Sequence, residues 1–380
     1  MTVCVYKSFN EIPSEVRERL SYPAQANFFL SLDWFSLLFE TSLLESLTPR
    51  IYVLLNNQGK AIGGLFCGVD PKARLRRLVS LTNFYTLEFS PSVVEKSGPR
   101  LEIITELVRY IAAERPRWHQ IGFNLMKREM VEVQRVSDDL KNSGFSPHPF
   151  FQYENWYFES GGSTFEDYFS GRSSQLRNTV SRKQKKLEKA HRVSIKIISS
   201  ESDQLQEVVR DFIAVYNRSW KRPEPFPDFI PTLAAVCAKL RILRLGVLYV
   251  DGKAAAGQFW INTPGKAIIY KLAYDEEYRD LGVGSVLSKE LFRVSLDEDR
   301  VAEIDYGVGS EPYKKEWMSS VRRVEGVQVF NRKTLVGFLM LTMQLVKPPL
   351  AAALRPAFSF LQALLKPSQV SVSSEATRQI

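Results

Sequence analysis

The chain has 380 residues and a net charge of +9, and 44% of its residues are hydrophobic. This length suits two domains of ordinary size, each able to bury its own core, and the apolar content excludes an intrinsically disordered protein. The positive charge favours anionic partners such as phosphates, CoA, nucleic acid or acidic lipid, without choosing among them.

Cysteine and histidine usage excludes two further classes. Three cysteines and three histidines are scattered along the chain, with no C-x-x-C pair. We therefore expect neither a disulfide framework nor a metal site, and the sparse thiols suit a reducing cytoplasm. The N-terminal residues lack the basic segment and apolar run of a signal peptide, so a cytoplasmic location is expected.

The first half predicts an α/β domain, because helical periodicity alternates with short apolar runs typical of strands. Helices are expected at 32–40, 101–113 and 130–142, and strands at 51–69 (a hairpin), 119–126 and 150–158. The hairpin has a counterpart at 245–262, in which a Gly-Lys turn again joins two apolar runs and a glycine again lies two residues before a phenylalanine. A Gly-Lys turn is a common hairpin by itself, but a spacing of about half the chain indicates a duplicated domain.

A basic helical stretch at 165–193 joins the halves. Leu176, Val180 and Leu187 give it a thin apolar stripe. Cations fill most of its other face: Arg172, Arg177, Arg182, Lys183, Lys185, Lys186, Lys189 and Arg192. Two interpretations are open, a solvated helix packed on its stripe or a patch for tRNA, acidic lipid or a phosphorylated sugar carrier. Aromatic residues are not interleaved with the cations, which disfavours single-stranded nucleic acid.

The second half predicts a strand at 194–199, helices at 203–220 and 229–240, a hairpin, and a strand at 267–275. The segment YRDLGVGSVLS follows, in which Arg279, Gly282 and Gly284 have the spacing R-x-x-G-x-G at the start of an amphipathic helix. Strand, glycine turn and helix N-terminus together suit a pyrophosphate, because free N–H groups and the helix dipole attract an anion that glycine lets approach closely. The dinucleotide and P-loop patterns are both absent.

A second block, IDYGVGSEPYKKEW, follows a short strand at 301–305. Its spaced residues are Asp305, Gly307, Gly309, Glu311, Tyr313 and Lys314. R-x-x-G-x-G resembles the acyl-CoA motif of the GNAT acyltransferases. The second block resembles the D-x-G-x-G-x-E-x-Y-K signature of the branch that includes FemAB-type peptidoglycan aminoacyltransferases and CelD-like proteins of polysaccharide synthesis. This resemblance implies an α/β (α+β) fold of two tandem GNAT-like domains, each with a mixed, mostly antiparallel sheet flanked by helices.

The resemblance also implies how a donor is held. The thioester carbonyl is expected to accept a hydrogen bond from a backbone N–H of the strand at 267–275, and the pyrophosphate is expected to rest on the glycine turn. The implied donor-binding residues are Leu272, Ala273, Arg279, Gly282, Val283, Gly284 and Ser285. The first half has no such turn, so it is expected not to bind CoA and to shape the acceptor cleft or serve a structural role only.

Transfer to an amine requires a base, since a lysine-like amine has a pKa of about 10.4, and a proton for the departing thiolate. Asp305 is the first candidate for base or amine anchor, and Glu311 competes for that role. Tyr313 is the candidate proton donor, and Lys314 is expected to hold a carboxylate or phosphate of the acceptor. Each has a plainer alternative, as a turn cap, a packing residue or a solvated charge.

Four segments are expected. Residues 1–160 form a GNAT-like domain without a CoA motif, 161–193 a basic connector, 194–333 the acyltransferase domain, and 334–380 an apolar or amphipathic tail with a disordered end. The apolar run at 335–346 falls short of the roughly 20 residues that cross a bilayer. It is expected to pack on the domain or to lie on an anionic inner membrane face, which its flanking cations suit.

The leading hypothesis is an N-acyltransferase that moves an acyl group from acyl-CoA, or from acyl carrier protein, to a small-molecule amine of envelope or polysaccharide synthesis. One alternative keeps the fold and takes the donor from aminoacyl-tRNA, as FemAB enzymes do; the complete R-x-x-G-x-G disfavours it. Another is a non-catalytic binding or scaffold subunit of an envelope-synthesis complex. No DNA partner is expected.

Overall fold

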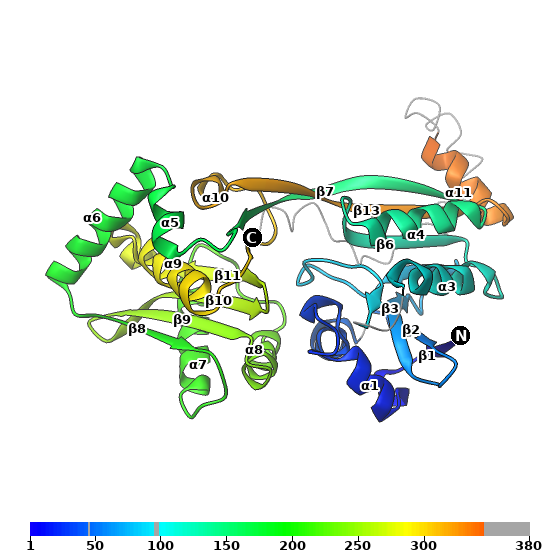
Figure 1. The fold of residues 1–380 in the computed structure, drawn as a ribbon, viewed down its shortest axis with the longest axis horizontal. Helices are drawn as coiled ribbons and strands as arrows, with labels where there is room; N and C mark the ends of the chain where they lie inside the picture. The colour runs from blue at the N-terminus through cyan, green and yellow to red at the C-terminus, as the bar shows by residue number, and fades with distance from the viewer. Residues whose placement is uncertain (45, 95–98, 346–380) are drawn as a thin grey trace. The chain divides into compact units, whose positions relative to one another are not determined.

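Contacts divide the chain into two compact units. The computed structural model describes residues 1–44, 46–94 and 99–345. Unit 1 comprises Met1–Gln152 and the described residues from Arg323 onward, and unit 2 comprises Tyr153–Arg322. Both contain a sheet flanked by helices (Figure 1). The boundaries expected from the sequence for separate domains stay a prediction.

Unit 1 has strands in the order β1-β2-β3-β4-β6-β13, with β5 on the side of β3. Pairing is antiparallel except between β4 and β6, which run parallel. The strands are β1 (Thr2–Tyr6), β2 (Thr48–Leu55), β3 (Ala61–Val69), β4 (Arg77–Ser80), β5 (Ser92–Val93), β6 (Gln120–Lys127) and β13 (Ser320–Asn331). The helices are α1 (Ser14–Leu20), α2 (Leu32–Leu38), α3 (Arg100–Ala113), α4 (Val131–Asn142) and α11 (Leu335–Leu345).

Unit 2 repeats this plan in the order β8-β9-β10-β11-β12-β7, again with one parallel pair, β11 with β12. The strands are β7 (Phe145–Glu159), β8 (Val193–Ile198), β9 (Leu243–Val250), β10 (Lys253–Thr263), β11 (Lys266–Tyr274) and β12 (Glu303–Asp305). The helices are α5 (Phe165–Ser170), α6 (Ser174–Ala190), α7 (Leu205–Asn217), α8 (Phe229–Lys239), α9 (Val283–Arg293) and α10 (Pro312–Trp317). The expected fold of two α/β units with mixed, mostly antiparallel sheets is confirmed.

The two hairpins that suggested a duplication occupy matching places. β2–β3 and β9–β10 each form the second and third strands of their sheet. Each turn contains a glycine with positive φ, Gly59 at 75° and Gly252 at 85°, a conformation that a residue with a side chain rarely adopts. In β10, a Cβ on Gly257 would come within 2.8 Å of the Phe212 ring, so this glycine lets α7 approach the sheet.

Two strands contain the points at which the chain passes from one unit to the other. β7 starts in unit 1, and its last residues pair with β12 in unit 2. β13 starts in unit 2 and pairs with β6 in unit 1. Each sheet is therefore bordered by a strand whose sequence begins in the other unit. The sequence analysis did not predict β13.

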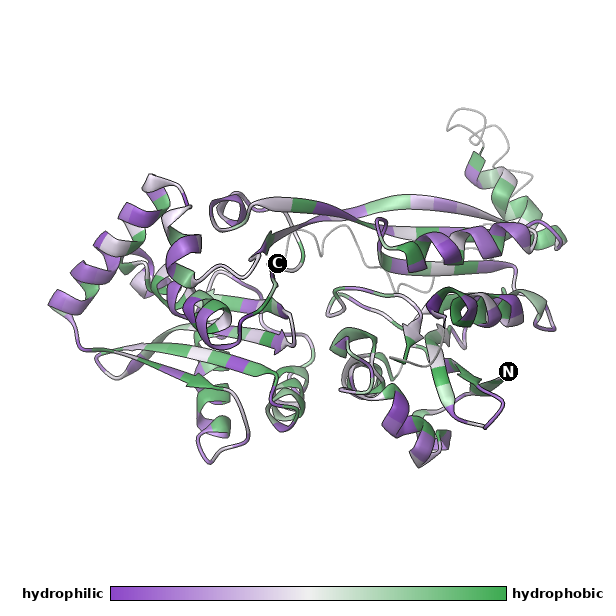
Figure 2. Cartoon of the chain, in the orientation of Figure 1, coloured by the Kyte–Doolittle hydropathy of each residue, from purple (hydrophilic) through white to green (hydrophobic). Residues whose placement is uncertain are grey.

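The basic helix α6 packs on its apolar stripe. Leu176, Val180 and Leu187 are buried in the same cluster as Val283 and Leu287 of α9. Figure 2 shows the remainder of α6 as largely hydrophilic. The prediction that α6 packs through its apolar stripe is therefore confirmed. That its cations bind a polyanion stays a prediction.

Helix α11 exposes part of its apolar surface. Met340 and Leu341 are buried against Phe330, whereas Leu335 is 75% and Phe338 is 49% exposed. Among the described residues, no helix is long and apolar enough to span a bilayer. A membrane surface as partner stays a prediction, and the expectations for residues 346–380 fall outside the described part of the chain.

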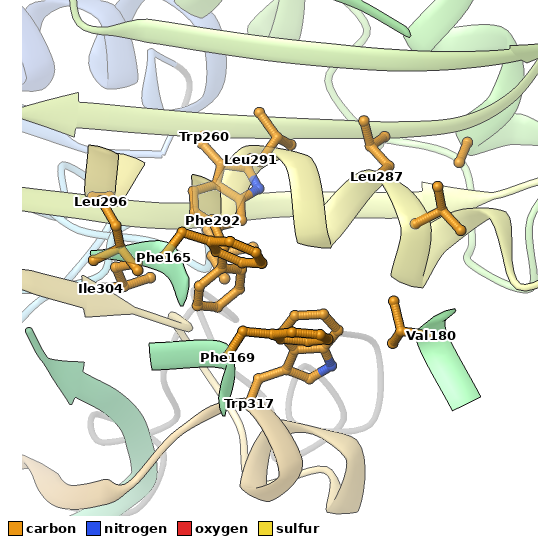
Figure 3. Packing of buried hydrophobic residues seen from close by; sticks show 14 of the residues in the cluster. Phe165, Phe169, Val180, Trp260, Leu287, Leu291, Phe292, Leu296, Ile304 and Trp317 are labelled. Atoms are coloured by element: carbon orange, nitrogen blue, oxygen red, sulfur yellow. The ribbon is translucent and has the colours of Figure 1, made fainter. Parts of the chain in front are cut away.

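Aromatic rings join the helices of unit 2 to its sheet (Figure 3). Phe292 of α9 stacks on Tyr168 at 4.9 Å and on Trp317 at 5.0 Å between ring centroids, and meets Trp260 of β10 edge-on at 5.2 Å. Because α9 follows the glycine turn, this cluster fixes the helix whose N-terminus is the predicted pyrophosphate site.

We predict that Phe292→Ala lowers the free energy of unfolding by about 3–5 kcal/mol, because it empties the centre of this cluster. Urea unfolding followed by tryptophan fluorescence measures the change. Phe338→Ala, on the exposed side of α11, is the matched control and should change stability by no more than about 0.5 kcal/mol. A similarly small effect of Phe292→Ala would contradict the role given to this cluster.

Candidate active site

The parallel strands β11 and β12 separate after a short pairing. Only Lys266–Ile268 of β11 pairs with β12, although β11 continues to Tyr274. After β12 the chain follows β7 instead, since the Tyr306 N–H donates to the Trp156 carbonyl at 2.8 Å. From residue 269 onward, the edge of β11 that faces β12 is therefore not paired with β12; this stretch is the open edge of β11.

The predicted carbonyl anchors lie on this open stretch of β11. Leu272 pairs with Gln258 of β10 and Ala273 with Gly257, on the opposite edge. The register shifts between Phe259, which pairs with Lys271, and Trp260, which pairs with Ile269. Such a bulge bends a strand and increases its twist.

The predicted pyrophosphate turn follows the end of β11. Gly282 has φ = 68° and precedes α9, and its carbonyl accepts the N–H groups of Ser285 and Val286 at 3.1 and 3.2 Å. The N–H groups of Val283 and Gly284 come before Ser285, the first donor to the Gly282 carbonyl, as expected for the anion-binding end of a helix.

Two contacts place the turn beside β11 and β10. A Cβ on Gly284 would come within 3.3 Å of the Tyr274 ring, so glycine permits the close approach. The Gln258 side chain donates to the Gly284 carbonyl at 3.0 Å and to Ser288 Oγ at 2.8 Å. The structure thus brings the predicted strand residues and the glycine turn together. Arg279 is exposed and binds Glu276 at 2.8 Å.

A cation also lies at the turn. Lys183 of α6 donates from Nζ to the Asp280 carbonyl, and its side-chain carbons lie 3.1–3.3 Å from where a Gly282 Cβ would be. The packing of α6 therefore places a positive charge near the predicted pyrophosphate position, which the sequence analysis did not foresee.

Asp305 ends β12 as the centre of a polar network. It is 4% exposed, and its Oδ1 accepts the Asn155 amide at 2.5 Å and the Gly307 N–H at 2.8 Å. Its Oδ2 accepts Arg322 at 2.5 Å and lies 2.9 Å from Lys266 Nζ. Both oxygens are occupied, so this geometry suits a positioning residue better than a base.

Glu303 shares the cations of this network. Arg322 binds its two oxygens at 2.9 and 2.7 Å, and Lys266 Nζ lies 3.1 Å from one of them. Burial acts to raise the pKa of Glu303, but the Arg322 hydrogen bond and the charges of Lys266 and Arg322 outweigh it and hold the pKa below its usual range. Four residues of this network were not predicted from the sequence: Asn155, Lys266, Glu303 and Arg322. The alternating residues of β13 are the signal that could have placed Arg322 in a strand.

The loop after Asp305 places the remaining signature residues. Lys314 is 2% exposed and donates to the Val308 carbonyl, with its Nζ 2.8 Å from Glu311. A Cβ on Gly309 would come within 2.8 Å of the Glu311 carboxylate, so the loop requires glycine there. Burial lowers the pKa of Lys314, against the opposing charges of Glu311 and Asp305. Its predicted contact with an acceptor stays a prediction.

Tyr313 is the most accessible of the predicted catalytic residues, at 39% exposure. Its ring meets the buried Tyr306 ring edge-on at 5.6 Å. Partial burial and the nearby Glu311 charge raise the pKa of Tyr313, so its hydroxyl stays protonated in the neutral range and can donate a hydrogen bond or a proton. Among the described residues, no group of three His, Cys, Asp or Glu is arranged to hold a metal ion.

Comparison with known proteins identifies the type of domain and the fold. A family model described as an acetyltransferase (GNAT) domain matches residues 174–315. The crystal structure of FemX matches with 10% identity and a TM-score of 0.57, over 86% of this chain and 97% of that chain. A conserved protein of unknown function from Bacteroides thetaiotaomicron matches with 12% identity and a TM-score of 0.53, over 87% and 100% of the two chains. A comparison with curated protein sequences finds no match.

Residues 174–315 are therefore an acyltransferase domain of the GNAT type. The chain as a whole shares its fold with FemX. The GNAT domain and the class of enzyme expected from the sequence are confirmed for these residues. The matched range includes α6, whereas the predicted boundaries of the basic connector stay a prediction.

We predict that Glu303→Gln destabilises the protein by about 1–3 kcal/mol at pH 7, because it removes charged hydrogen bonds to Arg322. The pKa of Glu303 is depressed in the folded state, so its contribution is present above the unfolded pKa of about 4.3 and is lost as the pH falls below it. Calorimetric unfolding between pH 7 and 3 should therefore show a shallower loss of stability in Glu303→Gln than in the parent.

The control for this experiment is Glu316→Gln, at an exposed position. It should keep the pH dependence of the parent. An unchanged pH dependence in Glu303→Gln as well would show that the network does not stabilise the folded state.

Proposed function

We propose that unit 2 transfers an acyl group from acyl-CoA to a small-molecule amine. One observation carries the proposal. The open edge of β11 leads directly to the glycine turn at the start of α9, and the two are in contact through Tyr274 and Gly284. An extended pantetheine can follow the strand edge, while the pyrophosphate accepts N–H groups of the turn. Lys183 adds a positive charge at the same place.

The reaction requires that the amine nitrogen attack the thioester carbonyl, that the carbon–sulfur bond break, and that the amine proton leave as the thiolate gains one. In this proposal, a backbone N–H group of β11 at Leu272 or Ala273 stabilises the oxyanion. Tyr313 is our candidate proton donor to the thiolate. Glu311, which is partly exposed, is the better candidate to accept the amine proton, because both Asp305 oxygens are already occupied.

The acceptor class is proposed from the resemblance to the envelope and polysaccharide branch of the family. An acyl carrier protein presents the same pantetheine thioester, and the same strand edge suits it. The exposed cations of α6 keep an aminoacyl-tRNA donor as a second candidate, which a salt-dependent gel shift with tRNA would support. A scaffold without activity would bind no acyl donor at all.

We predict that Gly284→Val weakens acetyl-CoA binding at least tenfold, about 1.4 kcal/mol. The side chain would press on Tyr274, which a Cβ already approaches to 3.3 Å, and would cover the N–H groups of the turn. Isothermal titration calorimetry on the full chain measures the affinity. Gly122→Val is the matched control in β6, since a Cβ there makes only an ordinary contact of 3.8 Å with Val79. Unchanged affinity in Gly284→Val would place the donor elsewhere.

We also predict that Tyr313→Phe lowers turnover by about 10²- to 10⁴-fold with little change in acetyl-CoA affinity, because it removes the hydroxyl and keeps the ring. Release of free thiol measures turnover once an accepted amine has been found. Full activity of the Phe variant from neutral to alkaline pH would make Tyr313 a packing residue on Tyr306.

A further inference from the structure

A second polar cluster lies in unit 2 around Tyr216, at the end of α7. The ammonium groups of Lys221 and Lys271 lie 5.7 and 5.4 Å from the centroid of its ring. Lys221 also lies 5.8 Å from the ring of Trp220. Two cations thus lie near one aromatic ring. The ring attracts each cation, but the two ammonium groups repel each other.

Two of the nearby lysines have carboxylate partners. Lys271 Nζ lies 2.5 Å from Glu224, and Lys314 Nζ lies 2.8 Å from Glu311. Within the described residues, Lys221 forms no ion pair; its side chain has only the two aromatic contacts. The cluster therefore holds three ammonium groups for two carboxylates, and the uncompensated one is Lys221.

The electrostatics of Lys221 follow from this arrangement. Burial and the charges of Lys271 and Lys314 outweigh the opposing charges of Glu311 and Glu224 and lower the pKa of Lys221 to about 7. Taking a charge out of water without a counter-ion is costly. A bound anion would supply the missing partner and would favour the ammonium form.

A cavity adjoins the cluster. It has a volume of about 230 Å³, and Tyr216 and Glu224 belong to both its wall and the cluster. The rest of its wall is mainly apolar, with Phe212, Ile213, Pro223 and Ile230. A small apolar group fits such a space, and the two lysines reach it through shared neighbours: both lie near the Tyr216 ring, and Lys271 pairs with Glu224.

We propose that Lys221, with Lys271 beside it, binds a carboxylate or phosphate group of the acceptor, and that the cavity receives an adjoining apolar part of the same molecule. The assignment of this anion to the acceptor rests on the proposed function. The existence of the anion site does not rest on the proposed function, because the donor pyrophosphate is assigned to a different place, the glycine turn of α9.

The test uses the full chain labelled with ¹³C-lysine, and two probes. Sulfate stays a dianion across the titration and mimics a phosphate group, and acetate represents a carboxylate. The Lys221 signal is identified by its loss in Lys221→Gln. We expect the Lys221 signal to titrate near pH 7 in the free protein. When the preferred probe saturates the site, the titration midpoint should rise by about one pH unit, which corresponds to a tenfold tighter binding of the proton.

Affinity for the preferred probe should fall as the pH rises through 7, because Lys221 loses its charge. Lys221→Gln should weaken binding at least tenfold, Lys221→Arg should retain most of it, and Lys253→Gln, at an exposed position, should leave it unchanged. A preference for sulfate identifies a phosphorylated acceptor, and a preference for acetate identifies a carboxylate.

Two results would overturn the proposal. One is that neither probe moves the Lys221 titration; the other is that Lys221→Gln binds the preferred probe as well as the parent does. Gly284→Val should leave the probe titration intact. The Gly284→Val variant therefore tests the proposed donor site, and the Lys221→Gln variant tests the proposed anion site, so one proposal can be wrong without the other.

Discussion

The early separation of β12 from β11 is the constraint on which the proposed site depends. Parallel strands normally satisfy each other's backbone groups, and here the pairing ends at Ile268 and Asp305. Asp305 is held from four sides by Asn155, Gly307, Arg322 and Lys266, so the chain must turn away at that residue. This buried network fixes the point at which β12 leaves β11. Asp305 can therefore support the site by holding β12 in place, without contacting the substrate itself.

The duplicated topology gives the two units the same sheet but different sites. In unit 2 the chain passes from Tyr274 through a short 3-10 helix (Glu276–Leu281) to Val283, and α9 starts beside the strand that precedes it. In unit 1 the corresponding connection runs from Ser80 to Arg100, and α3 starts after a proline with no side-chain cap. Among the described residues of these two connections, the compact one in unit 2 combines a strand end, a positive-φ glycine and a helix start. The same architecture thus supports a donor site in one unit without requiring it in the other.

Local features of the fold could be predicted from the sequence, whereas the partners of the site residues could not. The helix after Gly282 and the two hairpins depend on periodicity and turn chemistry within a few residues. Asp305 and Asn155 are 150 positions apart, and Asp305 and Arg322 are 17 apart in a strand that was missed. Lys221 was not singled out from the sequence, because its place beside Tyr216 and Lys271 is visible only once β11 and α7 are packed. The sequence therefore identified the signature residues but gave Asp305 a chemical role that its surroundings disfavour.

Hydrogen exchange measured by mass spectrometry, with and without acetyl-CoA, tests the central claim most directly, because the claim concerns backbone N–H groups. The account predicts slower exchange on acetyl-CoA binding in peptides that cover residues 269–274 and 282–286 of unit 2, with no change in β4 or the first turn of α3. Protection confined to unit 1, or acetyl-CoA binding that leaves both segments of unit 2 unprotected, would contradict it.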